Sequence, residues 1–98
     1  MPRSLVAPIM QPMRAAILAV GSELLGPDRI ESNSLLLAQT LRRYGVSLVR
    51  KSIVGDIEEE IGQELSTLLR DADVVLVCGG LGPTADDVTR EGVARALG

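Results

Sequence analysis

Histidine is absent from this 98-residue chain, and its single cysteine, Cys78, has no second cysteine with which to pair. The first absence excludes imidazole as a general base or metal ligand, and the second excludes a disulfide framework and a thiolate metal site. A chain without disulfides is typical of a reducing compartment, so we expect a cytoplasmic protein. Nine of the ten basic residues are arginine, the net charge is −3, and there is no basic run. The composition therefore gives no electrostatic footprint for nucleic acid.

Aromatic residues and long apolar runs are also scarce. Tyr44 is the one aromatic residue, so the hydrophobic content of 46% must form a core of aliphatic side chains. The run from Ala15 to Val20 is far too short to span a membrane, and we expect no membrane partner. Residues 1–13 hold three prolines without periodicity, and we interpret them as a flexible extension with the functional start at Met13. Residues 14–98 are enough for one small domain at most.

The pattern of apolar residues predicts an α/β protein. The expected strands are 14–20, 46–54 and 73–78, and the expected helices begin near Ser32, Asp56 and Ala85, the first of them ending at Gly45. The apolar residues of the first helix are Leu35, Leu36, Leu37, Ala38 and Leu41, and those of the second are Ile57, Ile61, Leu65, Leu68 and Leu69. The order β-α-β-α-β-α implies right-handed crossovers and a parallel sheet with helices on both faces.

Three polar loops follow the predicted strands, at 21–30, 55–56 and 79–85. Parallel strands end at the same edge of a sheet, and open α/β sheets bind their ligands at that edge. We therefore expect these loops to converge on a binding site, although they are far apart in the sequence.

The loop after the third strand, from Gly79 to Thr84, carries the clearest functional pattern. Its three glycines let bare backbone approach an anion, and the following helix offers free N–H groups in its first turn. A tight turn alone is the simpler alternative. The spacing Gly80-x-Gly82-x-x-Ala85 also fits a loose dinucleotide fingerprint, but the acidic ribose partner would fall beyond residue 98.

Carboxylates accompany these loops. Asp86 and Asp87 fall in the first turn of the third helix, where the helix dipole stabilises acidic side chains. Thr84 with Asp87 could also form a capping box. For Asp87 we favour a metal-holding role beside a phosphate. Asp56 is either the N-cap of the second helix or a group at the ligand edge, and spacing leaves both alternatives open.

The remaining polar candidates have simpler explanations as well. Ser22 and Glu23 are either ligand groups or solvated loop residues, and Asn33 and Ser34 either bind a ligand or cap the first helix. Cys78 is expected to be a small buried residue.

Taken together, residues 14–98 resemble the molybdopterin-binding domain at the N-terminus of the competence/damage-inducible protein CinA family. Four segments in order carry the resemblance: Ala19–Gly26 (AVGSELLG), Glu31–Ser34 (ESNS), Val54–Asp56 (VGD) and Cys78–Thr89 (CGGLGPTADDVT). It covers 85 of the 98 residues. The family domain continues past this point, so the chain is similar to a truncated domain, and we expect marginal folding and an incomplete site if it stands alone.

The resemblance implies a three-layer α/β/α fold with a mostly parallel sheet, as in MoaB- and Mog-like proteins. It implies Asp56 and Asp87 as catalytic and metal-binding residues for a divalent ion such as Mg²⁺. The implied ligand-binding residues are Gly21, Ser22, Glu23, Asn33, Gly79, Gly80, Leu81, Gly82, Thr84, Asp86 and Thr89. Asp86 stands where the molybdopterin adenylyltransferases carry arginine, which favours the CinA branch.

For CinA-type domains the implied activity is metal-dependent hydrolysis of the ADP-ribose pyrophosphate bond. The expected ligand is a small pterin or nucleotide, and the parent protein is expected to be a homo-oligomer. Two alternatives stay open: a non-catalytic binding or oligomerisation module, and an inactive fragment of a dinucleotide-binding domain.

Overall fold

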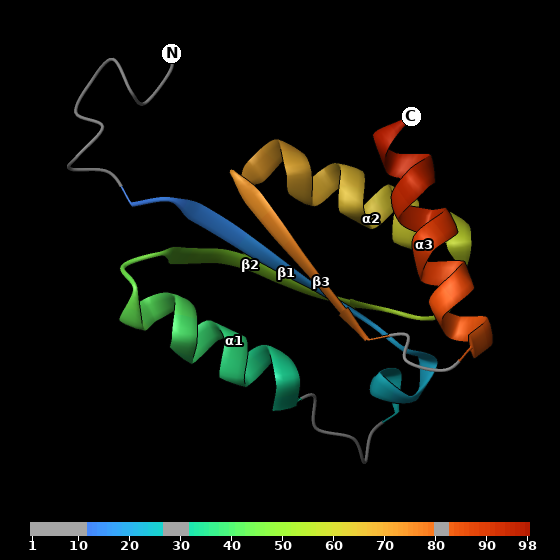
Figure 1. Cartoon of the computed structure of the whole chain (residues 1–98), viewed down its shortest axis with the longest axis horizontal. Helices are drawn as coiled ribbons and strands as arrows, with labels where there is room; N and C mark the ends of the chain where they lie inside the picture. Colours follow the sequence, from blue (N-terminus) through green and yellow to red (C-terminus); the bar gives the residue numbers. More distant parts are fainter. Residues whose placement is uncertain (1–11, 27–31, 80–82) are drawn as a thin grey trace.

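The computed structural model describes residues 12–26, 32–79 and 83–98 (Figure 1). In chain order its elements are β1 (Arg14–Val20), the 3-10 helix η3 (Ser22–Leu25), α1 (Ser32–Arg43), β2 (Ser47–Val54), α2 (Glu58–Asp71), β3 (Val74–Gly79) and α3 (Pro83–Leu97). The predicted α/β order is confirmed, and β1 has the bounds that the sequence predicts. Most of the predicted extension, residues 1–11, lies outside the described residues.

The three strands form one parallel sheet in the order β2-β1-β3. Figure 1 shows α1 on one side of the sheet and α2 and α3 on the other, so the predicted helical layers on both faces are confirmed. This arrangement follows from the chain order, because a helical crossover returns the chain to the same end of the sheet before each new strand.

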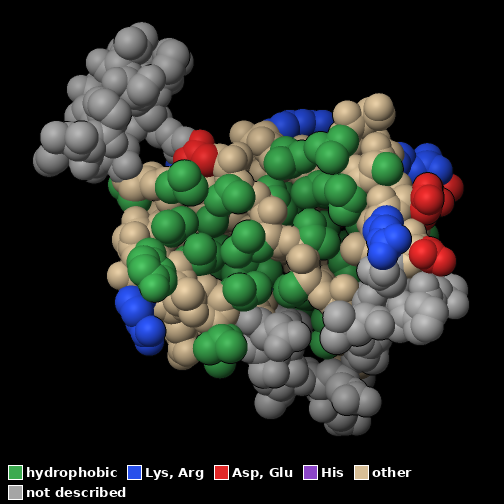
Figure 2. Space-filling view, viewed as in Figure 1, with side chains coloured by type: hydrophobic (Ala, Val, Ile, Leu, Met, Phe, Trp, Pro, Cys, Tyr) green, Lys and Arg blue, Asp and Glu red, His purple; other side chains and the backbone are tan. Residues whose placement is uncertain are grey.

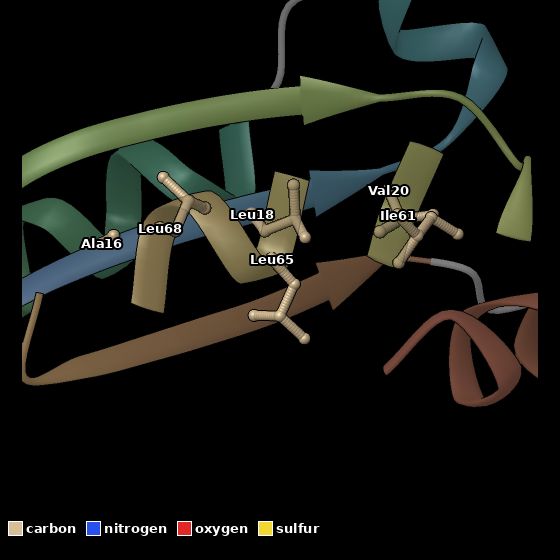
Figure 3. Packing of buried hydrophobic residues seen from close by; sticks show 6 residues of the cluster. All are labelled: Ala16, Leu18, Val20, Ile61, Leu65 and Leu68. Carbon is tan, nitrogen blue, oxygen red and sulfur yellow. The ribbon is translucent and has the colours of Figure 1, made fainter. Parts of the chain in front are cut away.

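The hydrophobic core lies between the central strand and α2. All six residues from Ala15 to Val20 are fully buried, since β1 has a strand on either side and helices on both faces. Ala16, Leu18 and Val20 face α2, where they pack with Ile61, Leu65 and Leu68 (Figure 3). Burying a leucine or isoleucine side chain contributes about 1.5–3 kcal/mol, so this cluster stabilises the packing of α2 on the sheet.

The helices bury narrower stripes than their sequences predict. In α2 the spacing of Ile61, Leu65 and Leu68 places them on the sheet, but Ile57 is 53% exposed. In α1 the predicted apolar face is only partly covered, because the side chains of Leu35 and Leu36 are 56% and 65% exposed. A run of consecutive leucines wraps around a helix, and only residues three or four apart can share the face that meets the sheet.

α2 and α3 pack against each other. Val88, Val93 and Ala96 of α3 contact the core cluster, and Arg95 lies 3.5 Å from Glu58 Oε1. α3 begins at Pro83, two residues before the predicted start, since proline suits the first helical position, where its missing N–H needs no partner. α3 therefore starts directly after the glycine-containing segment that follows β3.

The two edge strands differ in charge. β2 carries the exposed residues Arg50 and Lys51, whereas β3 consists of uncharged residues, all of them half-buried. Cys78 is thus half-buried, whereas the sequence predicts a small buried residue. Figure 2 shows hydrophobic side chains gathered over β3, between α1 and α2. No helix in the described part of the chain is long and apolar enough to cross a membrane.

Candidate functional site

The carboxyl ends of the three strands meet at one edge of the sheet. β1 ends at Val20, which the register pairs with Val54 at the end of β2 and with Gly79 at the end of β3. η3 follows β1 at this edge, and α2 and α3 begin near it (Figure 1). The convergence predicted from the chain order is confirmed for the parts of the three loops that the structure describes, and this is the edge where open α/β sheets bind ligands.

Ser22 and Asp56 are joined by two hydrogen bonds although 34 residues separate them. The Ser22 amide donates to Asp56 Oδ2 at 3.2 Å, and the Asp56 amide donates to Ser22 Oγ at 3.2 Å. Just before this pair, the Gly21 amide donates to the Val54 carbonyl at 2.9 Å. The loops that follow β1 and β2 are therefore tied together at the ligand edge.

The capping role that the sequence allows for Asp56 is wrong. α2 begins at Glu58, its N-cap residue is Ile57, and no side-chain hydrogen bond caps the helix. The Asp56 carboxylate binds the Ser22 amide instead of an amide of its own helix. Of the two alternatives for Asp56, its place at the ligand edge therefore remains.

The second carboxylate oxygen of Asp56 differs from the first in its hydrogen bonding. Asp56 Oδ1 is buried and has no hydrogen-bond partner among the described residues. A buried acceptor without a donor costs on the order of 1–3 kcal/mol. A bound cation or hydrogen-bond donor would recover that free energy, so Oδ1 is a candidate ligand atom among the described residues of this edge.

Two glycines shape the same edge for different reasons. Gly79 has a φ of +100°, and a Cβ there would collide with the Val20 carbonyl, so the chain can leave β3 this closely to β1 only at glycine. Gly55 is buried, and a Cβ there would lie 3.1 Å from Ser22 Oγ. Its role beside Ser22 was missed from the sequence, although a glycine between a strand and Asp56 is a signal for close approach.

The backbone at the start of α3 supplies hydrogen-bond donors. Pro83 has no N–H, and the amides of the next two residues have no partner within the helix. Such a terminus favours an anion through its free amides and the helix dipole. Asp87 lies one turn further on and is exposed, and Thr89 is half-buried.

Residues 16–98 match the family model described as "Probable molybdopterin binding domain". The chain belongs to the molybdopterin-binding domain family. The CinA-like protein of Solibacter usitatus is 45% identical over 85 residues, which are 87% of this chain and 20% of that protein. The CinA-like protein of Koribacter versatilis is 50% identical over 86 residues, which are 88% of this chain and 21% of that protein. The similarity to CinA-like proteins is thereby confirmed.

Solved structures show the same fold. The protein CinA of Thermoplasma acidophilum is 34% identical with a TM-score of 0.81, over 88% of this chain and 51% of that chain. The tungsten cofactor synthesizing protein MoaB of Pyrococcus furiosus is 25% identical with a TM-score of 0.75, over 86% of this chain and 52% of that chain. The chain spans about a fifth of the length of the curated relatives and about half of these solved chains.

The predicted site residues of this molybdopterin-binding domain fall into two groups. The structure places Gly21, Ser22, Asp56 and Gly79 at the ligand edge and Asp87 and Thr89 on α3. Gly80, Leu81 and Gly82 lie outside the described residues, as do the side chains of Glu23, Asn33, Thr84 and Asp86. The roles assigned to this second group stay predictions.

The oxygen donors at the edge suit a hard divalent cation. Among the described residues, no group of three or more histidine, cysteine, aspartate or glutamate side chains could hold a metal ion. Mg²⁺ commonly takes only one or two carboxylates and completes its shell with water and substrate phosphates. Asp56 Oδ1 is a carboxylate oxygen of this kind at the sheet edge, and Asp87 is an exposed carboxylate on α3.

An open groove of about 630 Å³ lies elsewhere on this domain, between α2 and α3. Gln63, Thr67, Arg70 and Arg95 are among its lining residues, and none of the predicted site residues lines it. It is a gap between the polar faces of two packed helices.

Proposed function

We propose that this domain binds a phosphate-bearing pterin or nucleotide at the carboxyl edge of its sheet. We further propose that, in a protein of its relatives' length, this edge hydrolyses the pyrophosphate of ADP-ribose with the help of a divalent metal ion. The observation that carries the proposal is Asp56, whose carboxylate does not cap α2 and has at this edge a buried oxygen without a hydrogen-bond partner in the described part of the chain.

The family and the fold support a pterin-type ligand. The matching family model is described as molybdopterin binding, and a solved relative is a tungsten cofactor synthesizing protein. A nucleotide has the same recognition elements available, because it too presents phosphate to backbone amides. The activity itself, the metal ion and the predicted homo-oligomer are part of the proposal.

In this proposal, two carboxylates hold the metal ion and backbone groups bind the phosphate. Asp56 and Asp87 would hold the divalent ion, which when bound supplies polarisation of the phosphoryl oxygens. Gly79 keeps the backbone close to β1, so that no side chain at this position stands between the strand ends and a ligand. The free amides at the start of α3 would donate to the phosphate and stabilise the charge that develops on it.

The first experiment compares thermal unfolding of the chain with and without ADP-ribose plus Mg²⁺. Ligand at 100 times its Kd stabilises the folded state by about 2.7 kcal/mol, which is a rise in Tm of roughly 10–20 °C for a domain of this size. Asp56→Asn and Asp87→Asn should each reduce the rise. Glu91→Gln, which neutralises an exposed acid on α3, should leave it unchanged.

Product analysis then separates the alternatives. Formation of AMP and ribose 5-phosphate that requires Mg²⁺ supports the hydrolase. A rise in Tm without turnover in both the chain and a longer relative indicates a binding module. A rise caused by NAD without metal indicates a dinucleotide-binding domain, and no rise with any of these ligands in either the chain or a longer relative contradicts the proposed site.

A further inference from the structure

The two hydrogen bonds between Ser22 and Asp56 form a closed pair. Each residue donates its backbone amide to the side chain of the other, at 3.2 Å in both directions. Neither side chain can turn away without leaving the other residue's amide without its acceptor. The pair therefore fixes both the position of the loop after β1 and the rotation of the Asp56 carboxylate.

The surroundings hold Ser22 in place from two further sides. The Gly21 amide is bonded to the Val54 carbonyl at 2.9 Å, so the residue before Ser22 is anchored to the end of β2. The Leu24 amide donates to the Gly21 carbonyl at 3.0 Å and starts the turn of η3. Gly55 leaves room for Ser22 Oγ, since a Cβ there would approach that oxygen to 3.1 Å.

The pair leaves the carboxylate with one open acceptor. Asp56 Oδ2 accepts from the Ser22 amide, while Oδ1 is buried without a partner among the described residues. We infer that Ser22 is a positioning residue that orients Asp56, so that Oδ1 is the oxygen offered to the metal ion or ligand donor. This inference rests on the proposed function, and it assigns Ser22 a role through Asp56 in place of the predicted direct contact with the ligand.

Substitutions of the two residues have different consequences. Ser22→Ala removes the hydroxyl acceptor for the Asp56 amide but keeps the backbone donor to Oδ2. Ser22→Thr keeps the hydroxyl and should restore the pair. Asp56→Asn can keep one oxygen for the Ser22 amide, but it puts an NH₂ group where Oδ1 was, which turns the open acceptor into a donor.

Amide hydrogen exchange on the ligand-free chain tests the pair itself. Ser22→Ala should speed exchange of the Asp56 amide by about fivefold, and Ser22→Thr should bring it back to the wild-type rate. Ser52→Ala is the matched control, because it removes a different serine hydroxyl bond, the 2.7 Å bond from Ser52 of β2 to Glu64 Oε1. Equal exchange of the Asp56 amide in wild type and Ser22→Ala would overturn the inference, whether or not any ligand binds.

Calorimetric titration with ADP-ribose plus Mg²⁺ tests the consequence. Ser22→Ala should weaken binding about fivefold, Ser22→Thr less than twofold, and Asp56→Asn at least tenfold. Ser52→Ala should lower Tm without weakening binding. Equal losses of affinity in Ser22→Ala and Ser52→Ala would mean that Ser22 acts on stability alone, which contradicts the positioning role. If Ser22→Ala speeds exchange of the Asp56 amide but the wild-type chain does not bind ADP-ribose plus Mg²⁺, the result supports the positioning of Asp56 and contradicts the proposed ADP-ribose ligand.

Discussion

Replacing Gly92 with alanine tests how closely α2 and α3 approach each other. A Cβ at this position would lie 2.6 Å from Ile61 Cγ2, 2.7 Å from Ile61 Cβ and 3.1 Å from the Glu58 carbonyl oxygen. These distances are too short for carbon contacts, and two of the three atoms belong to backbone or lie next to it. The helices must therefore shift apart to admit a single methyl group.

Two opposing effects decide the outcome. Alanine is favoured over glycine within a helix by about 1 kcal/mol, which would stabilise the variant. Overpacking a well-filled interface costs typically about 1–3 kcal/mol. Because little at Gly92 can yield, we expect a steric cost near the upper end and a net loss of about 1–2 kcal/mol. For a domain of this size, this is a decrease in Tm of roughly 5–15 °C.

Urea and thermal denaturation followed by circular dichroism would measure the change. Ala94→Gly is the control, since Ala94 is exposed two residues further along α3, and its loss of about 1 kcal/mol gives the helix-propensity effect alone. The double variant Ile61→Ala plus Gly92→Ala should lose less stability than the two single variants lose together. Ile61→Ala removes the Cγ2 atom that the new methyl group of Gly92→Ala would meet. The close packing would be refuted if Gly92→Ala raised the free energy of unfolding by as much as Ala94→Gly lowers it.

Two further predictions concern a glycine and a partly buried hydrogen bond. Gly79→Ala should abolish the cooperative unfolding transition or lower Tm further than Gly92→Ala does, because the new Cβ would collide with the Val20 carbonyl. Gly45→Ala is the control, since Gly45 has φ +75° and a Cβ there meets no described atom within 4 Å. It should lose only the about 1–2 kcal/mol that a left-handed backbone costs an alanine. Ser52→Ala should lower the free energy of unfolding in urea by about 1 kcal/mol through loss of its bond to Glu64, and an unchanged value would show that the bond contributes nothing in solution.

The sequence by itself determined the order of the elements and the parallel sheet. β1 is where the apolar run Arg14–Val20 predicts it, and Gly45, predicted as the stop of the first helix, has the positive φ that such a stop requires. These features are set by residues close together in the chain, through side-chain periodicity and the conformational freedom of glycine. The shared edge of the three loops follows as well, because crossover handedness leaves little choice.

Only the tertiary structure decided which residues at that edge act together. Ser22 and Asp56 were both predicted there, but no local pattern shows that they bond across 34 residues, or that this bond takes Asp56 away from the helix it would otherwise cap. The sheet order β2-β1-β3 and the contact of Gly92 with Ile61 were equally absent from the sequence pattern. The strand order and these contacts depend on interactions between segments that are distant in the sequence. Such interactions form only when the folded chain brings those segments together.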